Sequence, residues 1–190
     1  MKIQDGTGSG NVAGVNAAGQ LKVRGVSATP EHYFNHEKGQ AFQIPFQVTT
    51  EAANPRCFFY FKNTDSRDAV IEGLYVATDI ACELSVQLKN SGAPAGGTAV
   101  TPVNCHLNSG ILASGTFEYG ADLGNAASVL TGGTEWLVKK YFTTNNDTDF
   151  WNFEMDLIVP KNTVITLWSD TNSTTVTGTM VFHYGDTVSS

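Results

Sequence analysis

In the stretch IACELSVQLK, residues 80–89, large apolar side chains and Cys alternate with small or polar side chains. Successive side chains of a β-strand point to opposite faces, so this pattern predicts a half-buried strand with one face in a core and the other in water. The inward face would carry Ile80, Cys82, Leu84, Val86 and Leu88, and the outward face Ala81, Glu83, Ser85, Gln87 and Lys89. A slip of one residue would turn the whole apolar set outward, so the face is strongly specified.

Similar patterns recur on both sides of this stretch. They cover residues 40–48, 56–63, 69–77, 116–119, 134–142, 149–159, 163–169 and 174–184. RCFFYFKN (56–63) is aromatic on both faces, which predicts a strand covered on both sides. Pro45 removes a donor from the ladder and therefore predicts an edge strand or a bulge.

The spacing of these strands predicts the fold class. Turns rich in Asn, Asp and Gly separate eight or nine strands, and no helical spacer lies between them. We therefore expect an all-β fold, an antiparallel β-sandwich whose preferred arrangement is a jelly roll. The side chains expected inside are those of Ile80, Leu84, Val86, Leu88, Phe153, Leu157 and Phe182.

Two parts of the chain differ in composition. Residues 1–39 hold six glycines between Gly6 and Gly25, separated mostly by small or polar residues, which predicts an extended N-terminal arm before a sandwich domain at 40–190. A short helix between Thr29 and Gly39 also fits the sequence. Loops between residues 91 and 131 are expected to share in binding a partner. The apolar arm residues without a partner in their own segment, and hence the candidate interface residues, are Ile3, Val12, Val15, Leu21 and Val23.

Charge and hydropathy argue against several classes of partner. The 190 residues include 18 acidic and 11 basic side chains, a net charge of −7, and no cluster of Lys and Arg that would bind a phosphate backbone. No run approaches the roughly 18 apolar residues of a membrane span, and the first residues lack the apolar core of a signal peptide. We expect no nucleic-acid or membrane partner. The odd count of cysteines, without CxxC spacing, predicts reduced thiols at Cys57, Cys82 and Cys105.

Candidate metal ligands do not form a complete set. His32 and His36 have the i, i+4 spacing of a helical zinc site, but the Glu of HExxH is missing. His106 and His183 would join them only through tertiary contacts. Asp147 and Asp149 offer oxygen ligands for calcium, yet the surrounding run lacks the Gly and the terminal Glu of an EF-hand, so a polar hairpin is the simpler interpretation. The sequence predicts neither a metal nor a cofactor.

Candidate catalytic residues are equally sparse. Glu154 and Asp156 alternate on a strand about 7 Å apart, as acid–base catalysis on a glycosidic bond requires, but they also fit the wet face of that strand. Ser114 has no GxSxG context, and GTGSGN near the start lacks the Lys of a P-loop. We predict no catalytic residue and no enzyme. The three tryptophans, two of which are expected in the core, would form a sugar-stacking platform if exposed: Trp136, Trp151 and Trp168.

Several segments of the sequence together resemble those of a known protein family. They are NAAGQLKV (16–23), FFYFKNTDSRDAVIEGLYVA (58–77), GGTAVTPVNCHLNSG (96–110) and MDLIVPKNTVITLW (155–168). In these the chain resembles the β-sandwich decoration or cement proteins of tailed bacteriophages. The resemblance implies a jelly-roll or similar sandwich, self-association as a homotrimer and docking on the major capsid protein lattice. It also implies a place on the capsid surface of the virion after assembly in the host cytoplasm, and no catalytic residue.

Two alternative functions remain open at this point. One is a phage tail or fibre module that binds host-surface glycans, which exposed aromatic rings in a groove would favour. The other is a glycan-cleaving enzyme that uses Glu154 and Asp156, which two close carboxylates in a deep cleft would favour.

Overall fold

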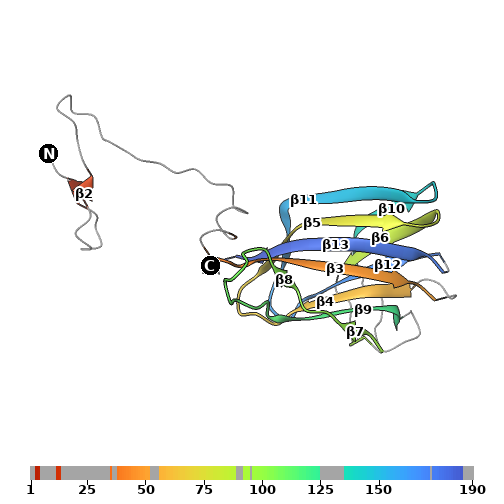
Figure 1. The fold of residues 1–190 in the computed structure, drawn as a ribbon, viewed down its shortest axis with the longest axis horizontal. Helices are drawn as coiled ribbons and strands as arrows, with labels where there is room; N and C mark the ends of the chain where they lie inside the picture. Colours follow the sequence, from red (N-terminus) through yellow and green to blue (C-terminus); the bar gives the residue numbers. More distant parts are fainter. Residues whose placement is uncertain are drawn as a thin grey trace, which may run out of the picture.

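The protein folds into two antiparallel β-sheets that pack face to face, as expected for an all-β sandwich (Figure 1). The computed structural model describes residues 3–4, 12–13, 35, 38–51, 56–88, 92–94, 96–124, 135–171 and 173–185. For residues 3–4, 12–13, 135–136 and 154–156 it describes the backbone alone. Within these residues no helix is long and apolar enough to cross a bilayer.

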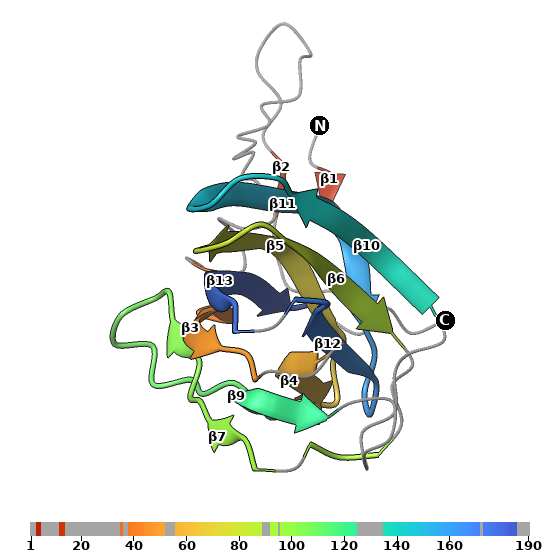
Figure 2. The ribbon, with the colours of Figure 1, turned by 90° about the vertical axis from the view of Figure 1, so that its right-hand side faces the viewer.

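The two sheets have five and six strands (Figure 2). The five-stranded sheet has the order β11 (Asp147–Val159), β5 (Ala69–Thr78), β13 (Thr175–Tyr184), β3 (Ala41–Thr49), β8 (Val103–Asn104). The six-stranded sheet has the order β10 (Glu135–Phe142), β6 (Cys82–Leu88), β12 (Val164–Ser169), β4 (Arg56–Asn63), β9 (Gly115–Gly124), β7 (Thr98–Ala99). From β3 to β6, and again from β10 to β13, consecutive strands alternate between the sheets, so each connection crosses from one layer to the other.

Aromatic rings from both sheets fill the space between the layers. The centroid of the Phe61 ring, on the six-stranded sheet, lies 5.4 Å from the centroid of the Phe182 ring on the five-stranded sheet. It lies 4.7 Å from the centroid of the Phe117 ring. Phe42 stacks on Phe182 at 5.4 Å. Each such side chain, once buried, contributes about 1.5–3 kcal/mol, so this layer supplies much of the driving force for folding.

The alternation in β3 and the two apolar faces of β4 are confirmed. In β3 the residues Phe42, Ile44 and Phe46 are buried while Pro45 is exposed. Because β8 pairs with β3 at residues 42 and 43 alone, the strand is an edge from Ile44 onward, and Pro45 breaks no ladder on that side. β4 is buried along nearly its whole length, as the aromatic run predicted.

The prediction of a half-buried β6 is wrong in one respect. Cys82, Leu84 and Val86 do belong to the main core, but the outward residues Glu83, Ser85 and Gln87 are buried too. The six-stranded sheet has a second apolar cluster on its outward side, which explains why that face is not wet. It consists of Cys57, Tyr60, Leu123, Val164 and Trp168.

The expected core residues fall into two groups. Leu84, Val86, Leu157 and Phe182 are buried in the main core, and Leu88 and Phe153 are partly buried against it. Ile80 is partly exposed in the bend that precedes β6, because the strand begins at Cys82.

Little of the predicted arm falls within the described residues. β1 (Ile3–Gln4) and β2 (Val12–Ala13) pair with each other, two short strands that the sequence pattern did not indicate. Val15, Leu21 and Val23 lie outside the described residues, as do the side chains of Ile3 and Val12. Most of the segment from Thr29 to Gly39 is also outside them, although the N–H of Gly39, at φ +60°, donates to the carbonyl of Asn35. The interface and helix predictions stay predictions.

Candidate functional site

The histidines predicted as possible metal ligands do not come together in the described part of the chain. His183 is buried on β13, where its Nδ1 lies 2.6 Å from Oε1 of Glu72. His106 lies in the loop after β8, and His32 and His36 fall outside the described residues. No group of three His, Cys, Asp or Glu side chains in those residues is placed to hold a metal ion.

The carboxylates at the start of β11 bond to groups on β10 and β11. Asp149 Oδ2 pairs with the Lys140 ammonium and accepts the Trp151 Nε1–H at 2.7 Å. Burial alone would raise the pKa of Asp149, but these two bonds outweigh it and hold that pKa below its usual value. Asp147 Oδ1 accepts the N–H of Thr148. The residues are polar as expected, but the hairpin prediction is wrong, because β10 pairs with β6 in one sheet and β11 with β5 in the other.

The residues considered for glycan chemistry have a mixed outcome. The side chains of Glu154 and Asp156 are not among those described, and the pairing of β11 with β5 shifts register between Asn152 and Leu157. Trp151 and Trp168 are buried, as expected for two of the three tryptophans. The side chain of Trp136 is likewise not described. Among the described side chains, therefore, no exposed tryptophan forms a platform for sugar stacking.

The cysteines are free thiols. Cys57 and Cys82 are buried, and burial raises the pKa of Cys82 to about 11 and that of Cys57 further still. Since the thiolate is the reactive form, both side chains behave at neutral pH as small apolar groups.

A loop between β8 and β9 presents apolar side chains to solvent. Leu107 and Leu112 are 78% and 76% exposed, and Val103 on β8 is 54% exposed. We call residues 105–114 the leucine loop. Its leucines project from the part of the chain, residues 91–131, in which the sequence predicted binding loops.

Hydrogen bonds hold the backbone of the leucine loop at its start. The side-chain amide of Asn104 donates to the carbonyl oxygens of Gly39 and Ile111, at 2.8 and 2.9 Å. Its Oδ1 accepts the N–H of His106 at 2.8 Å. One asparagine therefore ties both sides of the loop to the chain that enters β3.

A buried tyrosine holds the other end of the loop. The Tyr184 hydroxyl donates to the carbonyl of Ser114 at 2.7 Å and accepts the N–H of the same residue at 3.1 Å. The Tyr184 ring is fully buried, and the Arg67 guanidinium lies 5.0 Å from its centroid. The loop is thus fixed at both ends while its leucines stay in water.

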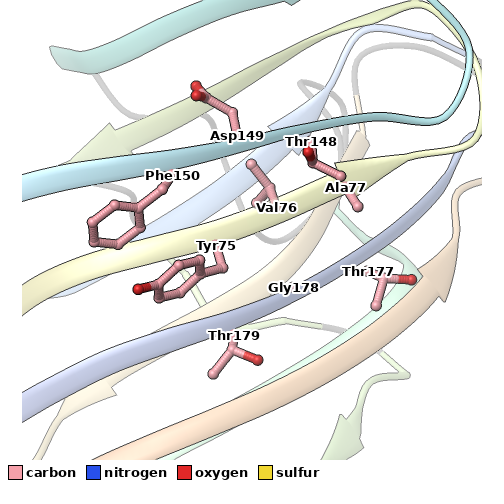
Figure 3. A pocket seen from close by; sticks show the side chains of 9 residues that line it. All are labelled: Tyr75, Val76, Ala77, Thr148, Asp149, Phe150, Thr177, Gly178 and Thr179. Carbon is pink, nitrogen blue, oxygen red and sulfur yellow. The ribbon is translucent and has the colours of Figure 1, made fainter.

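A second surface lies on the outward side of the five-stranded sheet, which we call the open face. Tyr75 on β5 and Phe150 on β11 are directly paired across the strands, and their rings stack with centroids 4.1 Å apart (Figure 3). Although they stack, the two residues remain 51% and 44% exposed. The pair forms one wall of a shallow groove of about 510 Å³.

The rest of the groove is lined by small and hydroxyl side chains. Ala77 and Thr148 lie beyond the rings, and Thr177 and Thr179 come from the neighbouring strand β13 (Figure 3). Sequence reasoning missed this site because Tyr75 and Phe150 are far apart in the chain, and the register that pairs them cannot be read from either strand alone. The exposed position of Tyr75 in the alternation of β5 was the available signal.

Comparison with known proteins assigns no family to the chain. No family model matches the chain, and no curated protein or solved structure is significantly similar to it.

Proposed function

We propose that the protein is a non-enzymatic structural protein of a phage virion, of the capsid decoration or cement type, which binds the major capsid protein lattice and stabilises it. The leucine loop is the observation that carries this proposal. Exposed leucines on a fixed backbone suit a protein partner, because docking then buries apolar surface without first having to order the loop.

The strand order supports assigning the sandwich to the jelly rolls. If β7, β8 and β9 are set aside and the strands β3–β6 and β10–β13 are numbered one to eight along the chain, the sheets read 6-3-8-1 and 5-4-7-2. This is the arrangement of two Greek keys in facing sheets. β7, β8 and β9 are then an insertion between the fourth and fifth strands, and the leucine loop belongs to that insertion rather than to the basic sandwich.

In this proposal the partners are the major capsid protein and further copies of the chain, which associate as a homotrimer on the capsid surface. Assembly takes place in the host cytoplasm. The predicted arm supplies further contacts through Ile3, Val12, Val15, Leu21 and Val23, because an arm of this composition gains enough buried area only against a partner.

The proposal is tested with capsid particles assembled from the major capsid protein of the same phage. In co-sedimentation, the double variant Leu107→Ser, Leu112→Ser should bind particles with an affinity at least about tenfold lower than that of the unmodified chain. The reason is that serine gains little free energy from being buried at the interface, whereas each leucine gains more. Leu137→Ser is the matched control, because Leu137 is also exposed but lies on β10, far from the leucine loop in sequence.

Two outcomes would contradict the proposal. One is failure of the unmodified chain to sediment with the particles at all, and the other is binding of the double variant as tight as that of the Leu137→Ser control. Equal thermal melts of the three proteins establish that the variants are folded.

The sequence also left a glycan-binding tail module as an alternative. Its tryptophan platform is not supported, because Trp151 and Trp168 are buried. The open face of the five-stranded sheet offers other aromatic rings.

A further inference from the structure

We propose that the groove on the open face binds a neutral oligosaccharide, with Tyr75 and Phe150 as the stacking platform and threonine hydroxyls as its hydrogen-bonding groups. This site goes beyond the proposed capsid function and does not rest on it, because the groove and the leucine loop are made by different residues.

The aromatic platform is preorganised. Each ring of the stacked pair restricts the other, and the Phe150 ring lies over the backbone of Gly73. A Cβ added at Gly73 would lie 2.4 Å from Cε2 of Phe150, so only glycine leaves room for the ring at this position. Sugar rings present apolar C–H faces, and rings fixed in advance bind them without a further loss of rotamer freedom.

Hydroxyl groups surround the remaining floor of the groove. Thr148 and Thr177 lie on either side of the small side chain of Ala77, and Thr179 lies beside Tyr75 in the aromatic wall (Figure 3). A hydroxyl both donates and accepts, which matches the mixed donors and acceptors of a sugar. Ala77, Thr148 and Thr177 also line an adjoining hollow of about 320 Å³ that extends to Gln47 and Asn146. Two neighbouring hollows that share these three residues suit several linked sugar units.

The charge of the lining favours a neutral ligand. No Lys or Arg lines either hollow among the described residues, so an anion would find no counter-charge. The two carboxylates at the margin already have partners: Asp149 bonds Lys140 and Trp151, and Asp79 Oδ1 accepts the N–H of Thr175 at 2.8 Å.

A peptide added as an extra strand does not fit this groove. Such a peptide pairs with an unpaired sheet edge, whereas β5 is already bonded to β11 on one side and to β13 on the other. The ligand must therefore bind to side chains on the face of the sheet, as a sugar does on aromatic rings and hydroxyls.

The test uses the full chain and a fixed panel of neutral hexasaccharides: α- and β-linked glucose, β-linked xylose, galactose and N-acetylglucosamine. Calorimetric titration to about 10 mM sugar detects a site with a dissociation constant as high as roughly 1 mM. This corresponds to a binding free energy of about −4 kcal/mol. At least one member should bind. Tyr75→Ala and Phe150→Ala should each weaken that binding at least about tenfold, and Thr177→Val about threefold through its lost hydroxyl.

Tyr141→Ala is the matched control, because Tyr141 is an exposed tyrosine on β10 of the other sheet and should leave binding unchanged. Three results would overturn the site: no panel member binds, binding survives both aromatic substitutions, or a sulfated hexasaccharide binds more tightly than its neutral counterpart. Thermal melts identify any variant that fails to fold, and amide chemical shifts at residues 75–77 and 148–150 then locate the sugar in the unmodified protein.

Discussion

The outward sides of the two sheets have opposite environments. On the six-stranded sheet, which we call the covered face, Trp168, Tyr60 and even Glu83 are buried. On the open face, Tyr75 and Phe150 are stacked but stay in contact with water. The sequences of β6 in the six-stranded sheet and β3 in the five-stranded sheet show the same period-2 alternation, yet the outward residues are buried on β6 and exposed on β3. The alternation therefore tells which way a side chain points, but not whether that side is covered.

Two buried polar side chains of the covered face, Glu83 and Thr166, have partners within that layer. Glu83 Oε1 lies 2.6 Å from the Lys139 ammonium, and the Thr166 hydroxyl accepts the Trp168 Nε1–H at 2.8 Å. Burying a polar group without such partners would cost several kcal/mol, so these bonds allow polar outward residues to remain in a covered layer.

The largest expected effect concerns the covered face. Trp168→Ala should lower the free energy of unfolding by about 3–5 kcal/mol, comparable to the loss of about 2–5 kcal/mol for Leu84→Ala on the inner side of the same sheet. Urea denaturation of both variants measures these values. A change below about 1 kcal/mol for Trp168→Ala would mean that its face behaves as surface.

A smaller effect is expected on the open face. Tyr75→Ala removes a half-exposed ring, so it loses the stacking with Phe150, about 0.5–1.5 kcal/mol, together with only part of a full burial contribution, and the total loss of stability should stay below that of Trp168→Ala. The same denaturation measurement applies. If this loss equalled that of Trp168→Ala, the contrast between the two faces would disappear.

The sequence predicted some of this architecture and not the rest, for identifiable reasons. The strand at 56–63 carries aromatic residues on both faces, and that composition alone indicated covering on both sides. The strand at 163–169 was expected only to alternate like its neighbours, yet β12 is buried along its whole length. Glu83 and Gln87 are polar, so nothing local to β6 indicated that Tyr60 and Trp168 would gather on the same side. The short strands β7 and β8 have only two residues each, too few for any periodicity.

The two candidate sites depend on long-range placement in the same way. The loops at 91–131 were expected to bind a partner, but the role of Asn104 and Tyr184 in holding the leucine loop required the structure. Tyr75 and Phe150 meet through the pairing of β5 with β11, and strand pairing is not encoded in either strand alone.

The smallest expected effect is a pH dependence. Burial would raise the pKa of Glu83, but the bonds from Lys139 and Tyr141 outweigh it and leave the pKa below its usual value. A carboxyl whose pKa is lower in the folded state stabilises the protein above its unfolded pKa of about 4.3, and loses that contribution as the pH falls through the folded value. Glu83→Gln should therefore reduce the fall in melting temperature between about pH 5 and pH 2. An unchanged acid slope would show that the Glu83–Lys139 pair contributes nothing measurable.

The position of the chain in an intact virion tests the central claim most directly. A cryo-electron microscopy reconstruction should place the sandwich on the outer surface of the capsid, with Leu107 and Leu112 of the leucine loop buried against the major capsid protein. Density for this chain at the tail tip alone, or on the capsid with the leucine loop facing solvent, would contradict the account.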